Sequence, residues 1–209
     1  MSYIGSKPAN KAVVASDLDP AVITGQTALS SEPASTDEFL ISDAGVLKRL
    51  DASLIGGGKI NQVLQTLKTD TFTSTSTSFA DITGLSVAIT PSATSSKILI
   101  MYSVFIGADN RGQIKLLRGS SDIFVGASDS ANRTESSGFG YNGNSDDNAV
   151  IHANSGVFLD SPNTTSETTY KLQAITNAGT VAINRTVLDD NQPYQPRTAS
   201  SITALEVLV

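Results

Sequence analysis

The sequence predicts a mainly β protein whose larger part is an antiparallel β-sandwich of the jelly-roll kind. Charged residues make up only 16% of the 209 residues, against about a quarter in typical domains. Apolar residues recur in short runs that alternate with polar residues, as half-buried strands do. Ser, Thr, Asn and Gly fill the spaces between these runs, which favours strands and turns over helices.

About the first 35 residues are expected to be extended, because Pro8, Pro20 and Pro33 interrupt them. Their apolar residues occur only in small groups, such as Val13-Val14 and Ala21–Ile23. Such a segment cannot close a core of its own. We expect it to be ordered by lying along a partner, with disorder as the alternative.

A β-hairpin is predicted next. Asp37–Ser42 forms one strand, a tight turn follows in which Gly45 supplies a positive φ, and Val46–Leu50 returns. Asp51 then has the position of an N-cap for a brief helix through Leu54-Ile55. Because an isolated two-stranded hairpin is marginal in water, this one needs copies of itself or a host surface to pack on.

Three consecutive glycines, Gly56–Gly58, form the clearest boundary in the chain. Such a run acts as a flexible joint or a sharp change of direction. We therefore divide the chain into an arm and hairpin region, residues 1–58, and a β-sandwich, residues 59–209.

Beyond the glycines, strand signals and turn residues alternate to the end of the chain. Roughly eight to ten short strands are expected, the pattern of a sandwich or jelly roll. The predicted strand positions are Leu85–Ile89, Lys97–Ile106, Ile114–Leu116, Ile123–Val125, Val150-Ile151, Val157–Leu159, Tyr170–Ala174, Val181–Ile183 and Leu205–Val209.

The run Lys97–Ile106 has apolar side chains on both faces. Its even-numbered residues from 98 to 106 lie on one face, while Leu99, Met101 and Phe105 lie on the other. A sandwich strand normally turns one face to the core and one to water. A second buried surface is therefore predicted, either beneath a covering loop or at a subunit interface.

The final run, residues 201–209, ends in an apolar residue without a polar tail. Chain ends usually fray unless they are tied down, so we expect a strand pinned inside a sheet near a symmetry axis. The two runs together predict a trimer interface formed by Leu99, Met101, Phe105, Leu205, Val207 and Val209.

The residues that usually carry catalysis are scarce. His152 is the only histidine and there are no cysteines, so His152 is interpreted as a structural strand residue. The carboxylate pairs Asp146-Asp147 and Asp189-Asp190 lie in turn-rich segments, which argues against glycan hydrolysis. Calcium at Asp146–Asn148 is conceivable but has no EF-hand spacing. We expect no enzyme, no cofactor and no metal.

Charge and hydropathy argue against two classes of partner. The formal net charge is −6, and the densest basic spot is Lys48-Arg49, so nucleic-acid binding is not expected. No apolar stretch approaches the roughly 18 residues of a membrane span, and the first residues lack the apolar core of a secretory signal. Membrane insertion is not expected either.

The long segment Gly119–Asn148 is rich in Ser, Asp, Asn and Gly. Long loops on a rigid scaffold often carry binding sites. Aromatic faces can stack on sugar rings, and carboxylates can accept hydrogen bonds from hydroxyls. A receptor-binding loop is therefore predicted at Phe139, Tyr141, Asp146 and Asp147; a solvated loop and a contact to a neighbouring subunit are the alternatives.

Several stretches resemble virion structural proteins. Asp37–Asp51 resembles the N-terminal attachment segment of tail-fibre and other virion proteins from marine and cyanobacterial phages, and Ile23–Leu29 fits the same group. Asp160–Ser166, leading into Tyr170, and Ser201–Glu206 resemble the C-terminal β-domains of these proteins. Such domains are similar to trimeric jelly rolls of the tumour-necrosis-factor and complement type.

The resemblance implies a homotrimer on the exterior of a virion, on the tail or the capsid, assembled in the bacterial cytoplasm. The N-terminal part would dock on other virion proteins and the C-terminal domain would form a distal knob that contacts a host surface glycan or protein. A capsid decoration, head-fibre or cement protein without a receptor is the alternative, and a glycan-modifying enzyme is less favoured. The implied anchor residues are Val22, Ile23, Phe39, Leu40, Ile41, Val46 and Leu47.

Overall fold

A computed structural model describes residues 25, 27, 33–34, 36–44, 46–55, 58–127, 132–141 and 148–209. The chain divides into two compact units, residues 1–56 and 57–209. Apart from one 3-10 turn, the regular secondary structure of the described residues is antiparallel β-structure, which confirms the predicted fold class. The predicted extended arm, with Val22 and Ile23, lies outside the described residues.

The first unit contains the predicted hairpin, formed by β1 (Glu38–Asp43) and β2 (Val46–Asp51). Ala44 in the turn has a φ of 51°, while Gly45 lies outside the described residues. Asp51 is the last residue of β2, opposite Glu38. The predicted brief helix is a single 3-10 turn, η2 (Ala52–Leu54), because the strand pairing continues up to it.

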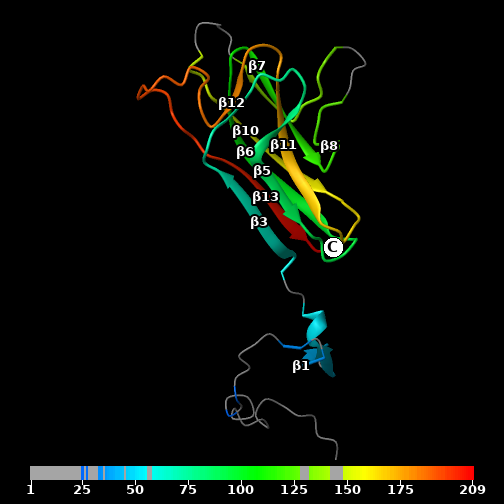
Figure 1. The fold of residues 1–209 in the computed structure, drawn as a ribbon. Helices are drawn as coiled ribbons and strands as arrows, with labels where there is room; N and C mark the ends of the chain where they lie inside the picture. The colour runs from blue at the N-terminus through cyan, green and yellow to red at the C-terminus, as the bar shows by residue number, and fades with distance from the viewer. Residues whose placement is uncertain are drawn as a thin grey trace, which may run out of the picture. The chain divides into compact units, whose positions relative to one another are not determined.

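The second unit is a sandwich of two antiparallel sheets (Figure 1). The first sheet contains β3 (Ile60–Lys68), β4 (Phe72–Ser74), β6 (Lys97–Ala108), β10 (His152–Asp160), β12 (Val181–Ile183) and β13 (Ser200–Val207). The second contains β5 (Ala80–Ile89), β7 (Arg111–Arg118), β8 (Ser121–Ile123), β9 (Gly138–Tyr141) and β11 (Thr168–Thr176).

Strand β6 organises the first sheet. It pairs with β13 over residues 97–103 and with β12 over residues 106–108, while β10 pairs with it over residues 98–106 on its other edge. Strand β3 then pairs with the outer edge of β13. In the second sheet the order is β5-β11-β7, with β8 and β9 both on the free edge of β7. Because long strands from distant parts of the chain alternate between the two sheets, the arrangement is jelly-roll-like.

The core lies between the sheets, where the even-numbered face of β6 meets the inner face of the second sheet. Each fully buried aliphatic or aromatic side chain contributes roughly 1.5–3 kcal/mol relative to exposure. The buried members are Ile98, Ile100, Tyr102, Val104 and Ile106 from β6, with Leu85, Val87, Ile89, Ile114, Leu116, Tyr170 and Leu172 from the facing sheet.

Three of the described strands, β3, β4 and β9, were not predicted from the sequence. Three predicted boundaries are also wrong. The final strand, predicted to reach Val209, is β13 and ends at Val207. Val150-Ile151 precedes β10, which runs unbroken to Asp160, and β8 ends at Ile123 because Phe124 has a φ of 52°. The segment Gly119–Asn148, in which Ile123–Val125 was the one predicted strand, contains both β8 and β9.

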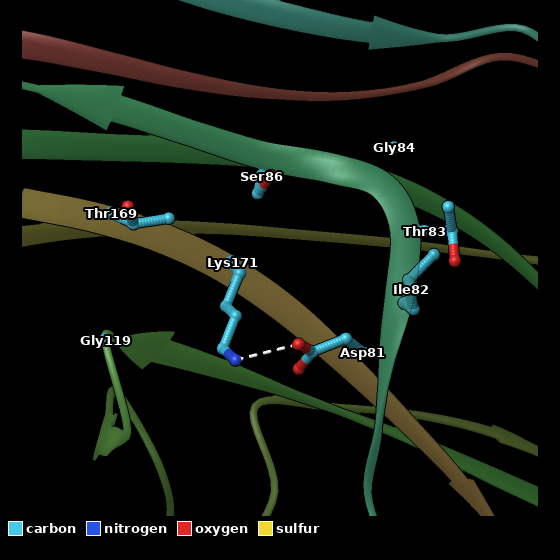
Figure 2. A pocket seen from close by; sticks show the side chains of 8 residues that line it. All are labelled: Asp81, Ile82, Thr83, Gly84, Ser86, Gly119, Thr169 and Lys171. Atoms are coloured by element: carbon cyan, nitrogen blue, oxygen red, sulfur yellow. Dashed lines mark hydrogen bonds and ion pairs between the residues drawn. The ribbon is translucent and has the colours of Figure 1, made fainter.

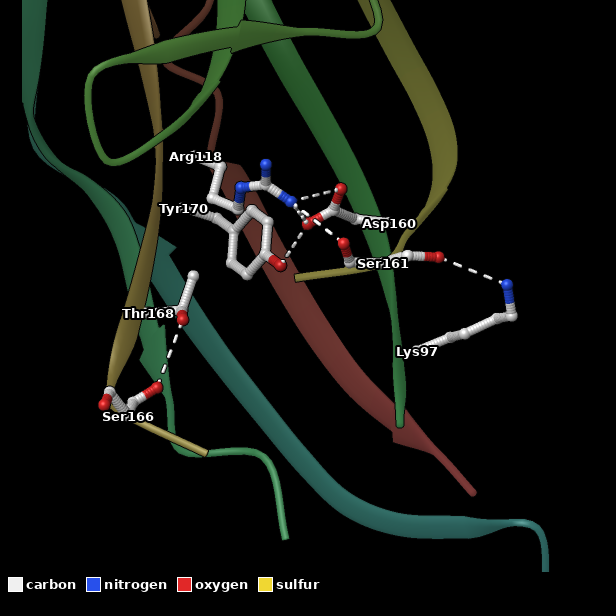
Figure 3. A network of polar contacts seen from close by, with 7 residues as sticks. All are labelled: Lys97, Arg118, Asp160, Ser161, Ser166, Thr168 and Tyr170. Carbon is white, nitrogen blue, oxygen red and sulfur yellow. Dashed lines mark hydrogen bonds and ion pairs between the residues drawn. The ribbon is translucent and has the colours of Figure 1, made fainter. Parts of the chain in front are cut away.

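A buried carboxylate joins the two sheets at one end (Figure 3). Asp160 of β10 accepts hydrogen bonds from Arg118 Nη1 at 2.9 Å and from the Tyr170 hydroxyl at 2.6 Å. Burial, with the Asp160 hydrogen bond, raises the pKa of the Tyr170 phenol, which keeps it protonated as a donor. Because Arg118 lies on β7 and Tyr170 on β11, this network fixes β10 against the second sheet.

Tyr102 crosses the sandwich interior next to a glycine. Its ring lies against Gly156 of the neighbouring strand, so that a Cβ at position 156 would be 2.5 Å from the ring. Its hydroxyl donates to the Ser137 carbonyl at 2.9 Å, and burial raises its pKa to about 12. Glycine at 156 is therefore required by the position of this aromatic ring.

We predict that Gly156→Ala lowers the free energy of unfolding by about 1–3 kcal/mol, because the ring must move and the Ser137 hydrogen bond is strained. Urea denaturation followed by tyrosine fluorescence would measure the change. Gly126→Ala is the control, since a Cβ there has nothing within 4 Å, and its effect should stay within about 0.5 kcal/mol. Equal effects of both substitutions would contradict the packing argument.

Candidate functional site

The outer face of the first sheet carries aligned rows of side chains across β3, β13, β6 and β10. In paired strands, residues directly opposite each other share a face. One row is Val63, Leu205, Leu99 and Leu159; the next is Gln65, Thr203, Met101 and Val157; the third is Leu67, Ser201, Ser103 and Ser155. Phe105 extends the surface beyond the third row. We call this surface the apolar face.

Large apolar side chains on this face are exposed to a degree that is unusual for a sheet surface. Val63, Leu67 and Val157 are 60%, 62% and 60% exposed, and Leu159 and Met101 are 48% and 37% exposed. The three rows contain no charged residue; Lys97, opposite Val207, lies at their end. Four strands span roughly 15 Å, and contiguous apolar surfaces of this kind mark interaction sites.

The outer face of the second sheet has the opposite character. Lys171 Nζ donates to Asp81 at 2.8 Å, Gln173 Nε2 donates to the same carboxylate at 2.7 Å, and Lys115 donates to Asp122 at 2.7 Å. The Lys171 and Gln173 hydrogen bonds lower the pKa of Asp81. The outer face of the second sheet is therefore polar and compatible with solvent exposure, whereas the outer face of the first sheet is apolar.

Most of the predicted trimer-interface residues lie on or beside the apolar face. Leu99, Met101, Phe105 and Leu205 are on it, and Val207 continues it next to Lys97. Val209 follows the end of β13 and is 71% exposed. The sequence did not identify Val63 and Leu67, because β3 was not predicted, nor Val157 and Leu159, whose face depends on the register with β6.

The predicted anchor residues are placed only in part. Phe39 and Leu40 are 41% and 73% exposed on opposite faces of the hairpin, and Ile41 is half-buried. The backbones of Val46 and Leu47 belong to β2, and their side chains lie outside the described residues.

Two of the predicted receptor residues, Phe139 and Tyr141, belong to strand β9. Phe139 is 47% exposed on β9, where its N–H donates to Asn154 Oδ1 at 3.0 Å. Tyr141 ends β9 opposite Arg111. Asp146 and Asp147 lie outside the described residues. His152 opens β10, opposite Ile106, and is half-buried.

A second exposed segment, residues 184–199, contains the Asp189-Asp190 pair but was not predicted as a binding site. Asn184 is buried with a φ of 64°, and its Nδ2 donates to the carbonyls of Lys68 and Asp70, both at 2.9 Å. The segment presents Leu188 and Tyr194, 51% and 65% exposed. The prolines on both sides of Tyr194 were a usable signal, since they hold a loop in a fixed path.

The predicted carboxylate pair in this segment has a structural role. Desolvation opposes ionisation of Asp189, but hydrogen bonds from Arg185 and Arg197 outweigh it and lower its pKa. Arg197 Nη2 lies 2.6 Å from the carboxylate, and Asp190 accepts a hydrogen bond from Gln195. Across the described ranges, no group of three or more His, Cys, Asp or Glu side chains is arranged to hold a metal ion. The described part of the chain has no helix long and apolar enough to cross a membrane.

No protein-family model and no curated protein matches the chain. Among solved structures, it is similar to the crystal structure of the infectious bursal disease virus VP2 subviral particle, with 17% sequence identity and a TM-score of 0.27. The match covers 80% of this chain and 40% of the VP2 chain, so this chain spans less than half of the solved protein. At so low a TM-score the similarity assigns the chain to no structural family.

A buried glutamate supports the apolar face from beneath. Glu206 of β13 is fully buried, and its carboxylate accepts hydrogen bonds from Asn61 at 2.8 Å, Gln62 at 2.6 Å, and the Ser92 N–H and hydroxyl, both at 2.6 Å. Desolvation alone would raise its pKa, but the hydrogen bonds from Ser92 and Asn61 dominate and lower it to about 2. The carboxylate thereby joins β13, β3 and the turn before β6.

We predict that Glu206→Gln destabilises the domain most at neutral pH. Because the folded pKa of about 2 lies below the usual 4.5, ionised Glu206 stabilises the fold above pH 4.5, and this contribution is lost as the pH falls towards 2. The difference in unfolding free energy between wild type and Glu206→Gln should therefore shrink over that interval. Urea titrations at pH 7, 4.5 and 3 would measure it; a difference that does not change with pH would contradict the assignment.

Proposed function

We propose that this chain is a virion structural protein: a trimeric short fibre whose N-terminal region anchors to other virion proteins and whose C-terminal domain contacts the host surface. The apolar face is the observation that carries the proposal. A protein that worked as a monomer would leave Val63, Leu67, Val157 and Leu159 in water on a rigid sheet, which monomeric proteins rarely do over a contiguous area.

The partner best suited to this face is a second and third copy of the chain. Homo-oligomers with closed symmetry are the common solution for a self-complementary apolar surface. Serines and threonines border the apolar rows and Gln65 donates to Thr203 at 2.8 Å, so the polar groups within the face are small or already bonded. Around a three-fold axis the apolar faces would turn inward, and the charged outer sheet would turn to solvent.

The hairpin fits the anchoring role. Phe39 and Leu40 are exposed on a two-stranded unit, and an isolated hairpin gains stability by packing on a larger surface. The phage-protein resemblance of Asp37–Asp51 supports the same assignment. We propose a binding and structural role on the virion exterior and no catalytic one.

Val157→Lys should dissociate the assembly. Three lysines would be brought together inside an apolar interface, where unpaired charges are strongly disfavoured. The side chain is 60% exposed in the single chain, so the fold itself should tolerate the change. Light scattering should show the mass falling about threefold, with an unchanged far-ultraviolet circular dichroism spectrum. Ala88→Lys, at an exposed position on the opposite outer face, is the matched control and should remain trimeric.

The full-length chain, of 21.7 kDa, and a fragment starting at Lys59 should both be trimers. The apolar face lies entirely within the second unit, so removal of the arm and hairpin should not affect assembly. If both proteins are monomers instead, the trimeric fibre loses its physical support. A decoration protein that is ordered only by the capsid then becomes the better account.

Virus particles that carry a truncated protein, residues 1–58 alone, would distinguish the fibre from the alternative of a decoration or cement protein. Intact particles that lose host adsorption would support the fibre. Particles that lose stability would instead assign the chain a cementing role on the capsid.

A further inference from the structure

The second sheet contains an irregularity on its polar outer face. Ser86 of β5 lies opposite Lys171 of β11, and Asp81 lies opposite Gln173. Between these pairs β11 contributes Leu172 alone, whereas β5 contributes residues 82–85. Ile82 and Leu85 both point into the core, so Thr83 and Gly84 bow outward, with Gly84 at a φ of 78°. Bulges of this kind often lie beside binding sites.

The bulge forms one wall of a polar hollow (Figure 2). The hollow has a volume of about 540 Å³ and is lined by Asp81, Ile82, Thr83, Gly84, Ser86, Gly119, Thr169 and Lys171. The Lys171 ammonium, which reaches Asp81 at 2.8 Å, retains further N–H donors for a ligand. Gln173 binds the other oxygen of Asp81 at 2.7 Å, so the carboxylate is held from two sides.

A second hollow adjoins the first. It has a volume of about 380 Å³ and is lined by Arg118, Gly119, Pro162, Thr164, Glu167, Thr168 and Thr169. The two hollows share Gly119 and Thr169. A Cβ at Gly119 would meet nothing within 4 Å, so the absence of a side chain leaves the junction open. We call the two hollows together the polar groove.

Each hollow of the polar groove is lined by one basic and one acidic side chain. The first hollow contains Lys171 and Asp81, and the second contains Arg118 and Glu167. An anionic ligand would meet a carboxylate in each hollow, and a cationic ligand would meet a basic group in each. A neutral ligand that both donates and accepts hydrogen bonds is repelled by neither the carboxylates nor the basic groups.

We infer that the polar groove binds a neutral oligosaccharide of at least two rings. Sugar hydroxyls both donate and accept, which matches the ammonium, the carboxylates and the hydroxyls of Thr83, Ser86, Thr168 and Thr169. Lys171 and Asp81 are oriented by their mutual ion pair and Arg118 by its ion pair with Asp160, so little ordering of these three groups is required on binding. The inference rests on the proposed function only for the origin of the ligand, a host surface glycan.

The probes are four neutral disaccharides (maltose, cellobiose, lactose and chitobiose), added to the full-length protein and followed by saturation-transfer NMR and calorimetry. At least one should bind, and Lys171→Ala should weaken it at least about tenfold, the effect of losing a charge-assisted hydrogen bond. Asp81→Asn should weaken it similarly. Lys115→Ala is the matched control, because its ion pair with Asp122 at 2.7 Å lies on the same sheet but lines neither hollow.

Gly119→Asn tests the continuity of the groove. Gly119 has a φ of 59°, a conformation that asparagine adopts with little strain, and the new side chain would enter the junction. The Gly119→Asn variant should no longer bind the disaccharide that the wild type binds, but it should still bind a monosaccharide unit of that disaccharide.

The inference would be overturned if none of the four disaccharides binds. It would also be overturned if Lys171→Ala, Asp81→Asn and Lys115→Ala all leave the binding equally intact. The mass of each variant separates this result from the proposed assembly. If the protein is a trimer but binds no disaccharide, only the inference about the polar groove is wrong. If it is a monomer that binds one, only the proposed trimer is wrong.

Discussion

The fold depends on β6, a central strand that is apolar on both faces. Its even-numbered residues form the middle of the core, and its odd-numbered residues Leu99, Met101 and Phe105 lie on the opposite side of the same sheet. A backbone with alternating side chains cannot turn both sets inward. One set therefore lies on the outer face of the sheet, and the neighbours β13 and β10 add Leu205, Val157 and Leu159 to it at matching register.

Register on β13 is fixed by a polar residue rather than by apolar alternation alone. A slip of one residue would exchange the two faces of the strand, taking Leu205 inward and Glu206 outward. Glu206 resists this because Asn61, Gln62 and Ser92 surround its carboxylate. Since β3 supplies two of these donors, the same contacts align Val63 with Leu205. A buried carboxylate on the inner face thus determines which side chains appear on the outer one.

The sequence predicts strands that alternate cleanly or that form a dense apolar run, and it misses β3, which does neither. The β5 and β11 segments alternate because one face is buried and the other is wet. Strand β3 has its large apolar residues at 60, 63, 64 and 67, a spacing with the period of a helix, because it is an edge strand that exposes side chains on both faces. The apolar face and the polar groove share this difficulty: both are built from residues far apart in sequence, brought together by strand pairing, and no local pattern contains that information.

The two outer faces of the sandwich differ in how well they can accommodate irregularities in strand pairing. The first sheet has an irregularity between Glu206 and Val207, where β13 pairs with β3 at the end of the rows. An irregularity within the rows that run from Val63 to Leu159 would displace their side chains. The bulge at Thr83 and Gly84 lies in the other sheet, where the neighbouring polar side chains Lys171, Gln173 and Asp81 are bonded to one another. A recess can form there while Ile82 and Leu85 keep their places in the core. The proposed recognition on the polar sheet and the proposed assembly on the apolar sheet can therefore vary independently, and substitutions that alter the groove need not alter an oligomer formed through the apolar face.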